Sequence, residues 1–232
     1  MGDKSNPGWR SRTRAVRAGL DRSPHGETSE ALFLNSGFVY DSAEQAEARF
    51  LGDDEGYIYS RYGNPTVSMF EERLAQIDGS EACFATASGM AAVFAALLCQ
   101  LQSGDHVVAS RALFGSCHYI LTQLLPRYGI KVDLVDGADL SQWQAKINDG
   151  TTVVFFETPS NPTLDLIDLE AVIELAHGVG ARVVVDNVFS TPILQRPAEY
   201  GADVVVYSVT KHMDVQGRIL GGAVLSSEAF IA

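Results

Sequence analysis

Seven short apolar runs recur along the chain, with polar or glycine-bearing segments between them. Several of these runs, such as Val153 to Phe156, are continuously apolar rather than alternating. Continuous runs are typical of strands that helices cover on both faces. We therefore expect strands at Ala82 to Ala85, His106 to Ala109, Lys131 to Val135, Val153 to Phe156, Arg182 to Val185, Val204 to Tyr207 and Ala223 to Leu225.

Helical patterns lie between these runs. Asn64-Pro65-Thr66 predicts a helix start, because proline suits the first helical turn, and apolar residues follow it at helical spacing. Gly89 to Leu101 is apolar nearly all round, which indicates a central buried helix. Further helices are expected at Gly115 to Leu125 and at Leu169 to His177. The alternation predicts an α/β fold with a mostly parallel, seven-stranded sheet.

The ends of the chain carry separate signals. The first 22 residues contain six basic side chains and no apolar stretch of the kind found in secretory signals. We favour a flexible arm there, and a basic transit peptide is the alternative. At the other end, Ser226 to Ile231 looks like the opening of a helix with no closing element after it. The chain therefore looks truncated at its C-terminus.

Composition excludes several classes of partner. Acidic residues number 29 against 17 basic ones, which gives a formal charge of -12. Nucleic acids and anionic membranes bind basic surfaces, so neither is an expected partner. The longest strongly apolar stretch, around Met90 to Cys99, is far shorter than the roughly 20 residues of a membrane span. Three cysteines without a Cys-x-x-Cys pattern favour a reduced, cytoplasmic protein. The histidines show no metal-ligand spacing, so we expect no metal.

Two ionisable residues at strand ends carry the main chemical signal. Lys211 follows the run Val204 to Tyr207, and Asp186 closes the run that begins at Arg182. An amine and a carboxylate at the ends of buried strands suit pyridoxal 5'-phosphate (PLP), with the lysine bonded to its aldehyde carbon and the aspartate paired with its ring nitrogen. The alternatives are a solvated surface lysine and an aspartate that caps a turn. We expect apolar surroundings for Lys211, which would favour its neutral, nucleophilic form.

Other segments are candidates for binding the phosphate. Ser88-Gly89-Met90 follows a strand and opens a helix, a place where N–H groups and the helix dipole bind anions. An ordinary serine cap is the alternative. Ser208 and Thr210 add two hydroxyl groups just before Lys211. Arg61 and Tyr59 are candidates for a phosphate clamp, unless they only decorate a loop.

Asn161 and Cys117 are two further candidates for a chemical role. Asn161 lies in a proline-rich loop, Glu157 to Pro162, and is a candidate donor to a cofactor oxygen unless the loop is merely structural. Cys117 has no identifiable base beside it except the adjacent His118. We therefore expect Cys117 to be a buried, unreactive thiol.

Taken in order, these segments resemble the Cys/Met-metabolism (trans-sulfuration) family of PLP-dependent enzymes, which have the aspartate-aminotransferase-like fold. The matching segments are Tyr59-Ser60-Arg61, Asn64-Pro65-Thr66, Ser88-Gly89-Met90, Glu157 to Pro162, Asp186-Asn187, and Ser208 to Lys211 with Gly221-Gly222. The resemblance covers nearly the whole chain beyond the first dozen residues.

The resemblance implies roles for these residues. Lys211 would hold PLP and act as the base, and Asp186 would hold the pyridine nitrogen. Gly89, Met90, Ser208 and Thr210 would bind the phosphate. Tyr59 and Arg61 would reach the phosphate of a neighbouring subunit, which implies a homodimer that usually pairs into a homotetramer. Residues 1–55 would then be an arm and dimer-contact segment, and 56–232 the PLP-binding large domain. The family's C-terminal small domain would be absent.

Two departures from the family's pattern indicate a branch. Where the family often has Tyr-Gly-Gly, this chain has Phe114-Gly115-Ser116, and a phenylalanine can stack on the cofactor but cannot donate a proton. Where it often has Gly-His-x-Asp after the lysine, this chain has His212-Met213-Asp214-Val215. Both features resemble the O-succinylhomoserine sulfhydrylase branch. That branch implies γ-replacement, in which O-succinylhomoserine and sulfide give homocysteine and succinate in methionine biosynthesis.

Alternatives stay open at this point. Cystathionine γ-synthase, an O-acetylhomoserine sulfhydrylase and a γ-lyase share the same chemistry. A PLP-binding but inactive fragment is an alternative of another class, because the family's C-terminal domain normally supplies the arginine that grips the substrate carboxylate. A generic doubly wound nucleotide binder is disfavoured, because no glycine-rich fingerprint follows the first strand.

Overall fold

The computed structural model describes residue 6 and residues 8–232. Residues 1–5 and 7, where the expected N-terminal arm begins, lie outside the described residues. The chain forms two compact units, residues 1–77 and 78–232. The expected division after residue 55 separates a subunit-contact arm from a cofactor-binding domain, which is a division by function, and it stays a prediction.

The first unit contains α1 (Ser11–Arg17), α2 (Ala43–Leu51) and most of α3 (Pro65–Asp78). The expected helix start at Pro65 is confirmed, and Asn64 caps it by accepting a hydrogen bond from the Thr66 N–H at 2.9 Å. The side chain of Asn64 also donates to the Phe33 carbonyl at 3.0 Å, and the side chain of Thr66 donates to the Ala31 carbonyl at 3.1 Å. The helix start therefore also holds the extended segment before it.

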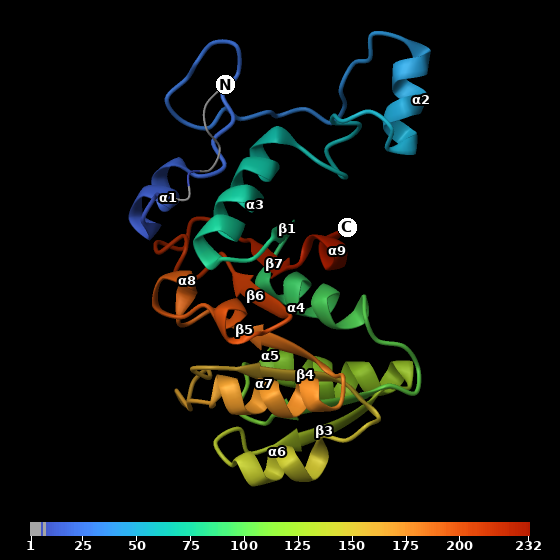
Figure 1. The fold of residues 1–232 in the computed structure, drawn as a ribbon, viewed down its shortest axis with the longest axis vertical. Helices are drawn as coiled ribbons and strands as arrows, with labels where there is room; N and C mark the ends of the chain where they lie inside the picture. The colour runs from blue at the N-terminus through green and yellow to red at the C-terminus, as the bar shows by residue number, and fades with distance from the viewer. Residues whose placement is uncertain (1–5, 7) are drawn as a thin grey trace. The chain divides into compact units, whose positions relative to one another are not determined.

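The second unit is built on a sheet of seven strands in the order β1-β7-β6-β5-β4-β2-β3 (Figure 1). Strand β7 runs antiparallel to both of its neighbours, and the pairs among β2 to β6 are parallel. The predicted fold class and all seven predicted strands are confirmed. The strands are β1 (Ala82–Thr86), β2 (His106–Ser110), β3 (Lys131–Val135), β4 (Thr151–Glu157), β5 (Arg182–Asp186), β6 (Val204–Ser208) and β7 (Gly222–Ser226).

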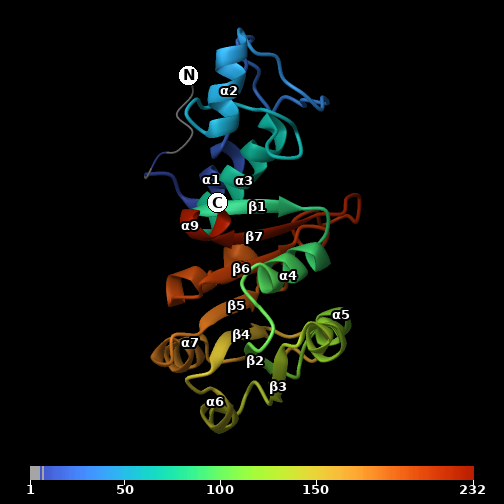
Figure 2. The same ribbon diagram turned by 90° about the vertical axis from the view of Figure 1, so that its right-hand side faces the viewer.

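Helices cover both faces of this sheet. Figure 2 shows α4 (Gly89–Leu98) and α5 (Gly115–Tyr119) on one side, and α6 (Leu140–Lys146) and α7 (Leu169–Gly178) on the other. Successive side chains of β4 enter opposite cores. Phe155 packs in the cluster under α4, and Phe156 packs in the cluster under α7, where the Trp143 ring meets it edge-on at 5.9 Å. Both faces of the strand are buried, which explains why its sequence is continuously apolar.

Two helical predictions need correction. The helix expected to be centrally buried, α4, buries only one face. Ala92 and Leu97 are fully buried, whereas Phe94 is 37% exposed, because the sheet covers α4 from one side. The helix expected at Gly115 to Leu125 is helical throughout but changes form. After α5 it continues as a π-helical turn (Ile120–Leu124) and a 3-10 turn (Leu125–Tyr128). Pro126 lacks the N–H that a regular α-helix needs there.

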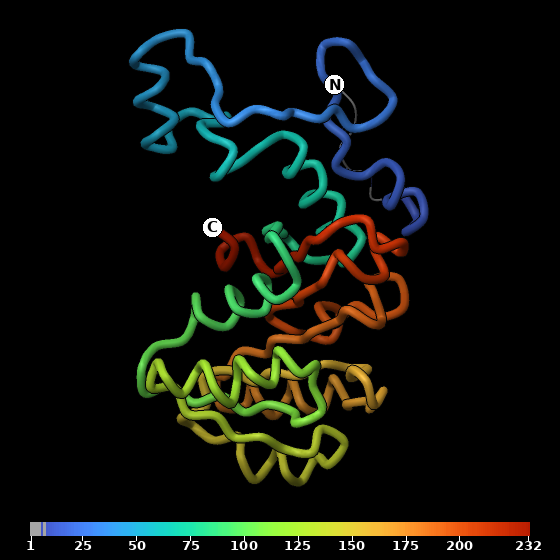
Figure 3. The backbone as a smooth tube through the Cα atoms, turned by 180° about the vertical axis from the view of Figure 1, so that it is seen from behind, coloured from blue at the N-terminus to red at the C-terminus, as the bar shows by residue number. Residues whose placement is uncertain are grey.

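Figure 3 shows this helical run from behind, in front of the sheet and opposite α7. Short elements complete the unit: α8 (Thr191–Leu194), a 3-10 turn (Pro197–Tyr200) and α9 (Glu228–Ile231), which confirms the helix opening expected near the C-terminus. None of the helices in the described part of the chain is long and apolar enough to cross a membrane.

Candidate cofactor-binding site

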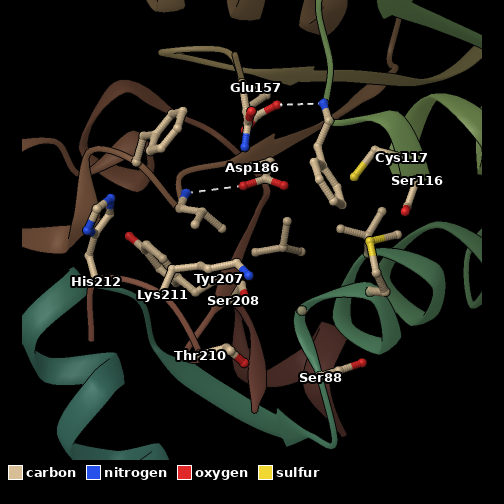
Figure 4. Close-up of a pocket in the computed structure, with 18 of the residues that line it drawn as sticks. Ser88, Ser116, Cys117, Glu157, Asp186, Tyr207, Ser208, Thr210, Lys211 and His212 are labelled. Atoms are coloured by element: carbon tan, nitrogen blue, oxygen red, sulfur yellow. Dashed lines mark hydrogen bonds between the residues drawn. The ribbon is translucent and has the colours of Figure 1, made fainter. Parts of the chain in front are cut away.

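The carboxyl ends of the parallel strands open onto a cavity of about 560 Å³ (Figure 4). This edge is where ligands bind in parallel α/β sheets. Nine of the residues proposed from the sequence line the cavity: Ser88, Gly89, Met90, Phe114, Asn161, Asp186, Ser208, Thr210 and Lys211. They come from segments that lie more than 120 positions apart at the extremes, so the fold alone brings them together.

Tyr59 and Arg61 belong to the first unit and do not line this cavity. The Arg61 guanidinium lies over the rings of Tyr59, at 4.9 Å, and Tyr62, at 5.1 Å. A hydrogen bond with Tyr62 raises the pKa of Arg61, so the guanidinium group stays positively charged. The expected contact of these residues with a neighbouring subunit's phosphate stays a prediction.

The N-terminus of α4 forms one end of the cavity. Ser88 is its cap, and its Oγ accepts a hydrogen bond from the Ala91 N–H at 3.2 Å. The first N–H groups of a helix have no acceptor within the helix, so those of Gly89 and Met90 are available to an anion. Ser88 is thus both the ordinary cap and a cavity residue.

Gly89 lets the helix start approach the end of β6. A Cβ on Gly89 would lie 2.5 Å from the Cβ of Ser208, and real Cβ atoms do not come that close to another carbon. The Ser208 hydroxyl group and the helix N-terminus are therefore neighbours. The hydroxyl of Thr210 is already engaged, because it accepts from the Gly221 N–H at 3.0 Å and donates to the Gly221 carbonyl at 3.3 Å. Ser88 and Ser208 remain the simpler hydroxyl donors to an anion.

We expect Gly89→Ala to weaken PLP binding by about tenfold or more, because the new methyl group pushes Ser208 away from the helix N-terminus. Gly178→Ala is the matched control, since a Cβ there meets nothing within 4 Å and its backbone is ordinary. Equilibrium titration of each variant with PLP measures the effect. Equal affinity for Gly89→Ala and the parent would show that this close approach does not shape the anion site.

Asp186 and Glu157 lie side by side at this edge of the sheet. They close β5 and β4 and are partners in register, and both are buried. Asp186 also accepts the Val188 N–H at 3.1 Å, which confirms the turn-capping alternative, while its role at a pyridine nitrogen stays a prediction. Burial, and then the neighbouring Glu157 carboxylate, raise the pKa of Asp186 to about 7. A cation placed against this pair would relieve their repulsion.

Lys211 lies in the turn after β6, where its N–H donates to the Ser208 carbonyl at 3.1 Å. Its side chain reaches into the cavity on the side facing Asp186 (Figure 4). The residue is exposed. The cavity that it lines also has apolar residues in its wall, among them Phe189 and Leu220, and the apolar surroundings expected from the sequence stay a prediction. The next residues are held by Asp214, whose carboxylate accepts from the Arg218 N–H at 2.6 Å and Nε at 3.1 Å. This pair orders the segment that departs from the family's pattern.

Two groups that line the cavity are not predicted as site residues from the sequence. Glu157 belongs to the loop motif Glu157 to Pro162, and its place at a strand end is the signal that could identify it. Tyr207 lines the cavity, and its hydroxyl group donates to Asp78 at 2.5 Å and accepts from Asn187 at 2.8 Å. Asp78 lies 129 positions away, and no local pattern indicates such a pair.

Cys117 lines the cavity but is buried, as expected. Burial, helped by the nearby carboxylates of Asp186 and Glu157, raises the pKa of this thiol well above its ordinary value, so it stays protonated. Among the described residues, no group of three or more His, Cys, Asp or Glu side chains is arranged to hold a metal ion.

The chain is similar to enzymes of known sequence and structure. The chain is 57% identical over 219 residues to the O-succinylhomoserine sulfhydrylase of Mycobacterium tuberculosis (strain CDC 1551 / Oshkosh), covering 94% of this chain and 54% of that protein. It is 49% identical over 212 residues to the O-succinylhomoserine sulfhydrylase of Pseudomonas aeruginosa, covering 91% and 53%. The chain thus spans about half the length of the curated relatives it matches.

A solved structure from Campylobacter jejuni, which contains N'-pyridoxyl-lysine-5'-monophosphate, superposes with a TM-score of 0.91 at 32% identity. The match covers 96% of this chain and 55% of that one. The family model described as "Cys/Met metabolism PLP-dependent enzyme" matches residues 12–231. Since that match covers nearly the whole chain, this chain belongs to the Cys/Met metabolism family of PLP-dependent enzymes.

Proposed function

We infer that this chain is the PLP-binding part of an enzyme that converts O-succinylhomoserine and sulfide to homocysteine and succinate. The observation that carries the proposal is the single cavity that joins Lys211, Asp186 and the N-terminus of α4. Relatives that are 57% and 49% identical and are named O-succinylhomoserine sulfhydrylases support the choice of substrate. A homodimer or homotetramer and a cytoplasmic location are parts of the same proposal.

The chemistry of the cavity fits PLP. A phosphate group suits the N-terminus of α4, with Ser88, Gly89, Met90 and the hydroxyl group of Ser208 as donors. Thr210 adds a further donor if its hydroxyl group gives up its hydrogen bond to the Gly221 carbonyl. A protonated ring nitrogen suits the buried carboxylate of Asp186, and an aldehyde suits the amine of Lys211. Phe114 offers an aromatic face, and Asn161 an amide donor, to the ring and its oxygen.

The residues then divide the work of γ-replacement. When bound, PLP supplies an electron-withdrawing ring that stabilises negative charge on the substrate's α-carbon. The Nζ atom of Lys211 removes the α-proton and moves protons between neighbouring carbons. Asp186 keeps its negative charge beside the ring nitrogen. At the γ-carbon the C–O bond to succinate breaks, a C–S bond to sulfide forms, and succinate leaves with the bonding electron pair.

Phe114 suits this leaving group. Succinate leaves as a carboxylate, whose acid has a pKa of about 4, whereas a thiol has a pKa of about 8.5. A thiolate therefore gains much more from a proton donor, and phenylalanine has none. This argument favours an acylhomoserine over cystathionine or methionine as the substrate.

Turnover measured on a panel of substrates tests the proposal. O-succinylhomoserine, O-acetylhomoserine, cystathionine and methionine would each be supplied to the 232-residue chain and to a longer chain that covers the rest of the relatives' length. We expect sulfide-dependent release of succinate to be the fastest reaction of the longer chain. Efficient cleavage of cystathionine with no turnover of either acylhomoserine would contradict the proposal. Turnover by the 232-residue chain alone would rule out the inactive-fragment alternative.

We expect Phe114→Tyr to raise the turnover of cystathionine relative to O-succinylhomoserine, because the new hydroxyl group supplies a proton donor where the thiolate departs. General acids contribute about 10²-fold or more when well placed, so a rise of about tenfold is a modest expectation. The ratio of kcat/KM for the two substrates is the measurement. Phe94→Tyr, on the exposed face of α4 and outside the cavity lining, is the matched control.

A further inference from the structure

Glu157 is buried at the centre of the site, and the reaction described above does not use it. It closes β4, is only 3% exposed and lines the cavity. A buried carboxylate is costly unless it is hydrogen-bonded or paired with a charge. Its partners therefore show what holds it there.

Two backbone N–H groups from different loops stabilise the charge of this carboxylate. The Phe114 N–H, in the loop after β2, donates to Oε2 at 2.9 Å (Figure 4). Burial raises the pKa of Glu157, and the Asn161 N–H, in the loop after β4, opposes this rise together with the Phe114 N–H. Each loop carries one proposed contact to the ring of PLP. The carboxylate thus ties together the residues expected to lie around that ring.

The charge of Glu157 also affects the neighbouring carboxylate site at Asp186. Its register partner is Asp186, the proposed partner of the ring nitrogen. Two adjacent carboxylates give this edge of the sheet a stronger negative potential than one, and that potential favours a cation in front of Asp186. Glu157 thus contributes in two ways: its oxygen atoms accept hydrogen bonds from the two loops, and its charge acts on the ring nitrogen. A neutral amide of the same size keeps an oxygen acceptor but removes the charge, so it separates the two contributions.

We propose that Glu157 is a positioning residue for the cofactor, whose ionised carboxylate fixes Phe114 and Asn161 around the ring and strengthens the hold of Asp186 on a protonated ring nitrogen. The inference rests on the proposed function, since it assumes that PLP occupies this cavity. It assigns Glu157 no contact with the substrate and no proton transfer.

Glu157→Gln and Glu157→Ala separate the two contributions. The glutamine keeps an oxygen acceptor but loses the charge, and the alanine loses both. We expect Glu157→Gln to weaken PLP binding by about tenfold, and Glu157→Ala to weaken it further. The absorbance of bound PLP, titrated with pH, should show its midpoint at lower pH in Glu157→Gln, because one negative charge no longer stabilises the protonated form. Glu170→Gln, on the exposed surface of α7, controls for net charge.

Amide hydrogen exchange in the PLP-free chain gives a readout that does not depend on the cofactor. The amides of residues 114 and 161 should exchange faster in Glu157→Ala than in the parent, with Glu157→Gln between them. Circular dichroism and thermal melting show whether each variant folds. If Glu157→Ala does not fold, the PLP affinity and the absorbance midpoint of Glu157→Gln test the inference by themselves.

The outcomes distinguish this inference from the proposed function. If Glu157→Gln matches the parent in PLP affinity and in absorbance midpoint, the inference is overturned while the proposed function stands. If borohydride fixes no PLP on Lys211 of the parent chain, the proposed function fails for this chain. Hydrogen exchange then tests only whether Glu157 holds the two loops. Unchanged exchange of both amides in Glu157→Ala would overturn that part of the inference.

Discussion

Replacing Lys211 by alanine is expected to abolish covalent capture of PLP and to lower turnover by about 10³-fold or more. A general base alone contributes about 10²- to 10⁴-fold, and this lysine is also the proposed point of attachment. The residue is exposed, so thermal stability should hardly change. The combination of lost chemistry and retained stability is the signature of a catalytic residue.

Borohydride reduction followed by peptide mapping measures the capture. In the parent chain the reduced pyridoxyl group should lie on Lys211, and in Lys211→Ala no peptide should carry it. Lys131→Ala, another exposed lysine at the start of β3, is the control and should retain full labelling. Lys211→Arg keeps a positive charge but supplies no neutral amine at neutral pH, so it should behave like the alanine variant. Stoichiometric labelling of another lysine in Lys211→Ala would show that our assignment is wrong.

The strands and the site could be predicted from the sequence because both follow from one property of parallel sheets. Strands covered on two faces are continuously apolar, as Val153 to Phe156 shows, so their ends are visible as the first polar residues. The carboxyl ends of parallel strands share one edge. Asp186, Ser208 and Lys211 therefore had to lie near each other once the strands were assigned.

Other features depend on what lies beside a residue and leave little trace in the sequence. An apolar strand such as Gly222–Ser226 has the same pattern in either direction, so the antiparallel course of β7 was not predicted. The apolar sequence of α4 does not tell which of its faces the sheet covers. The hydrogen bond from Tyr207 to Asp78 joins residues 129 positions apart. The position of Glu157 at a strand end is visible in the sequence, but its hydrogen bond from the Phe114 N–H is not.

Asp186→Asn is expected to change how the stability of the PLP-free chain depends on pH. Folding raises the pKa of Asp186 to about 7, from an ordinary value of 3.8. Between these pH values the folded chain holds a proton that the unfolded chain has released. The contribution of this carboxyl group to stability is thus fully present below about pH 4 and is lost as the pH rises through about 7.

The parent chain should therefore lose about 2–3 kcal/mol of unfolding free energy between pH 5 and pH 8 through this group. The asparagine variant lacks that loss and should be the more stable protein at pH 8. A smaller slope should remain in it, because burial also raises the pKa of Glu157. Urea unfolding at both pH values measures the difference. Asp149→Asn, in an exposed loop, should keep the parent's slope, and parallel slopes for Asp186→Asn and the parent would contradict the assignment.

Saturating PLP should reverse the order of the two proteins. A cation on the ring nitrogen stabilises the ionised form of Asp186, so the parent regains at pH 8 what it lost in the free state. Asparagine carries no charge to pair with that nitrogen, and the variant should gain much less from PLP. Asp186 thus lowers the free energy of unfolding of the PLP-free chain at neutral pH and raises that of the PLP-bound chain. The positive charge of the ring nitrogen offsets the cost of burying the ionised carboxylate.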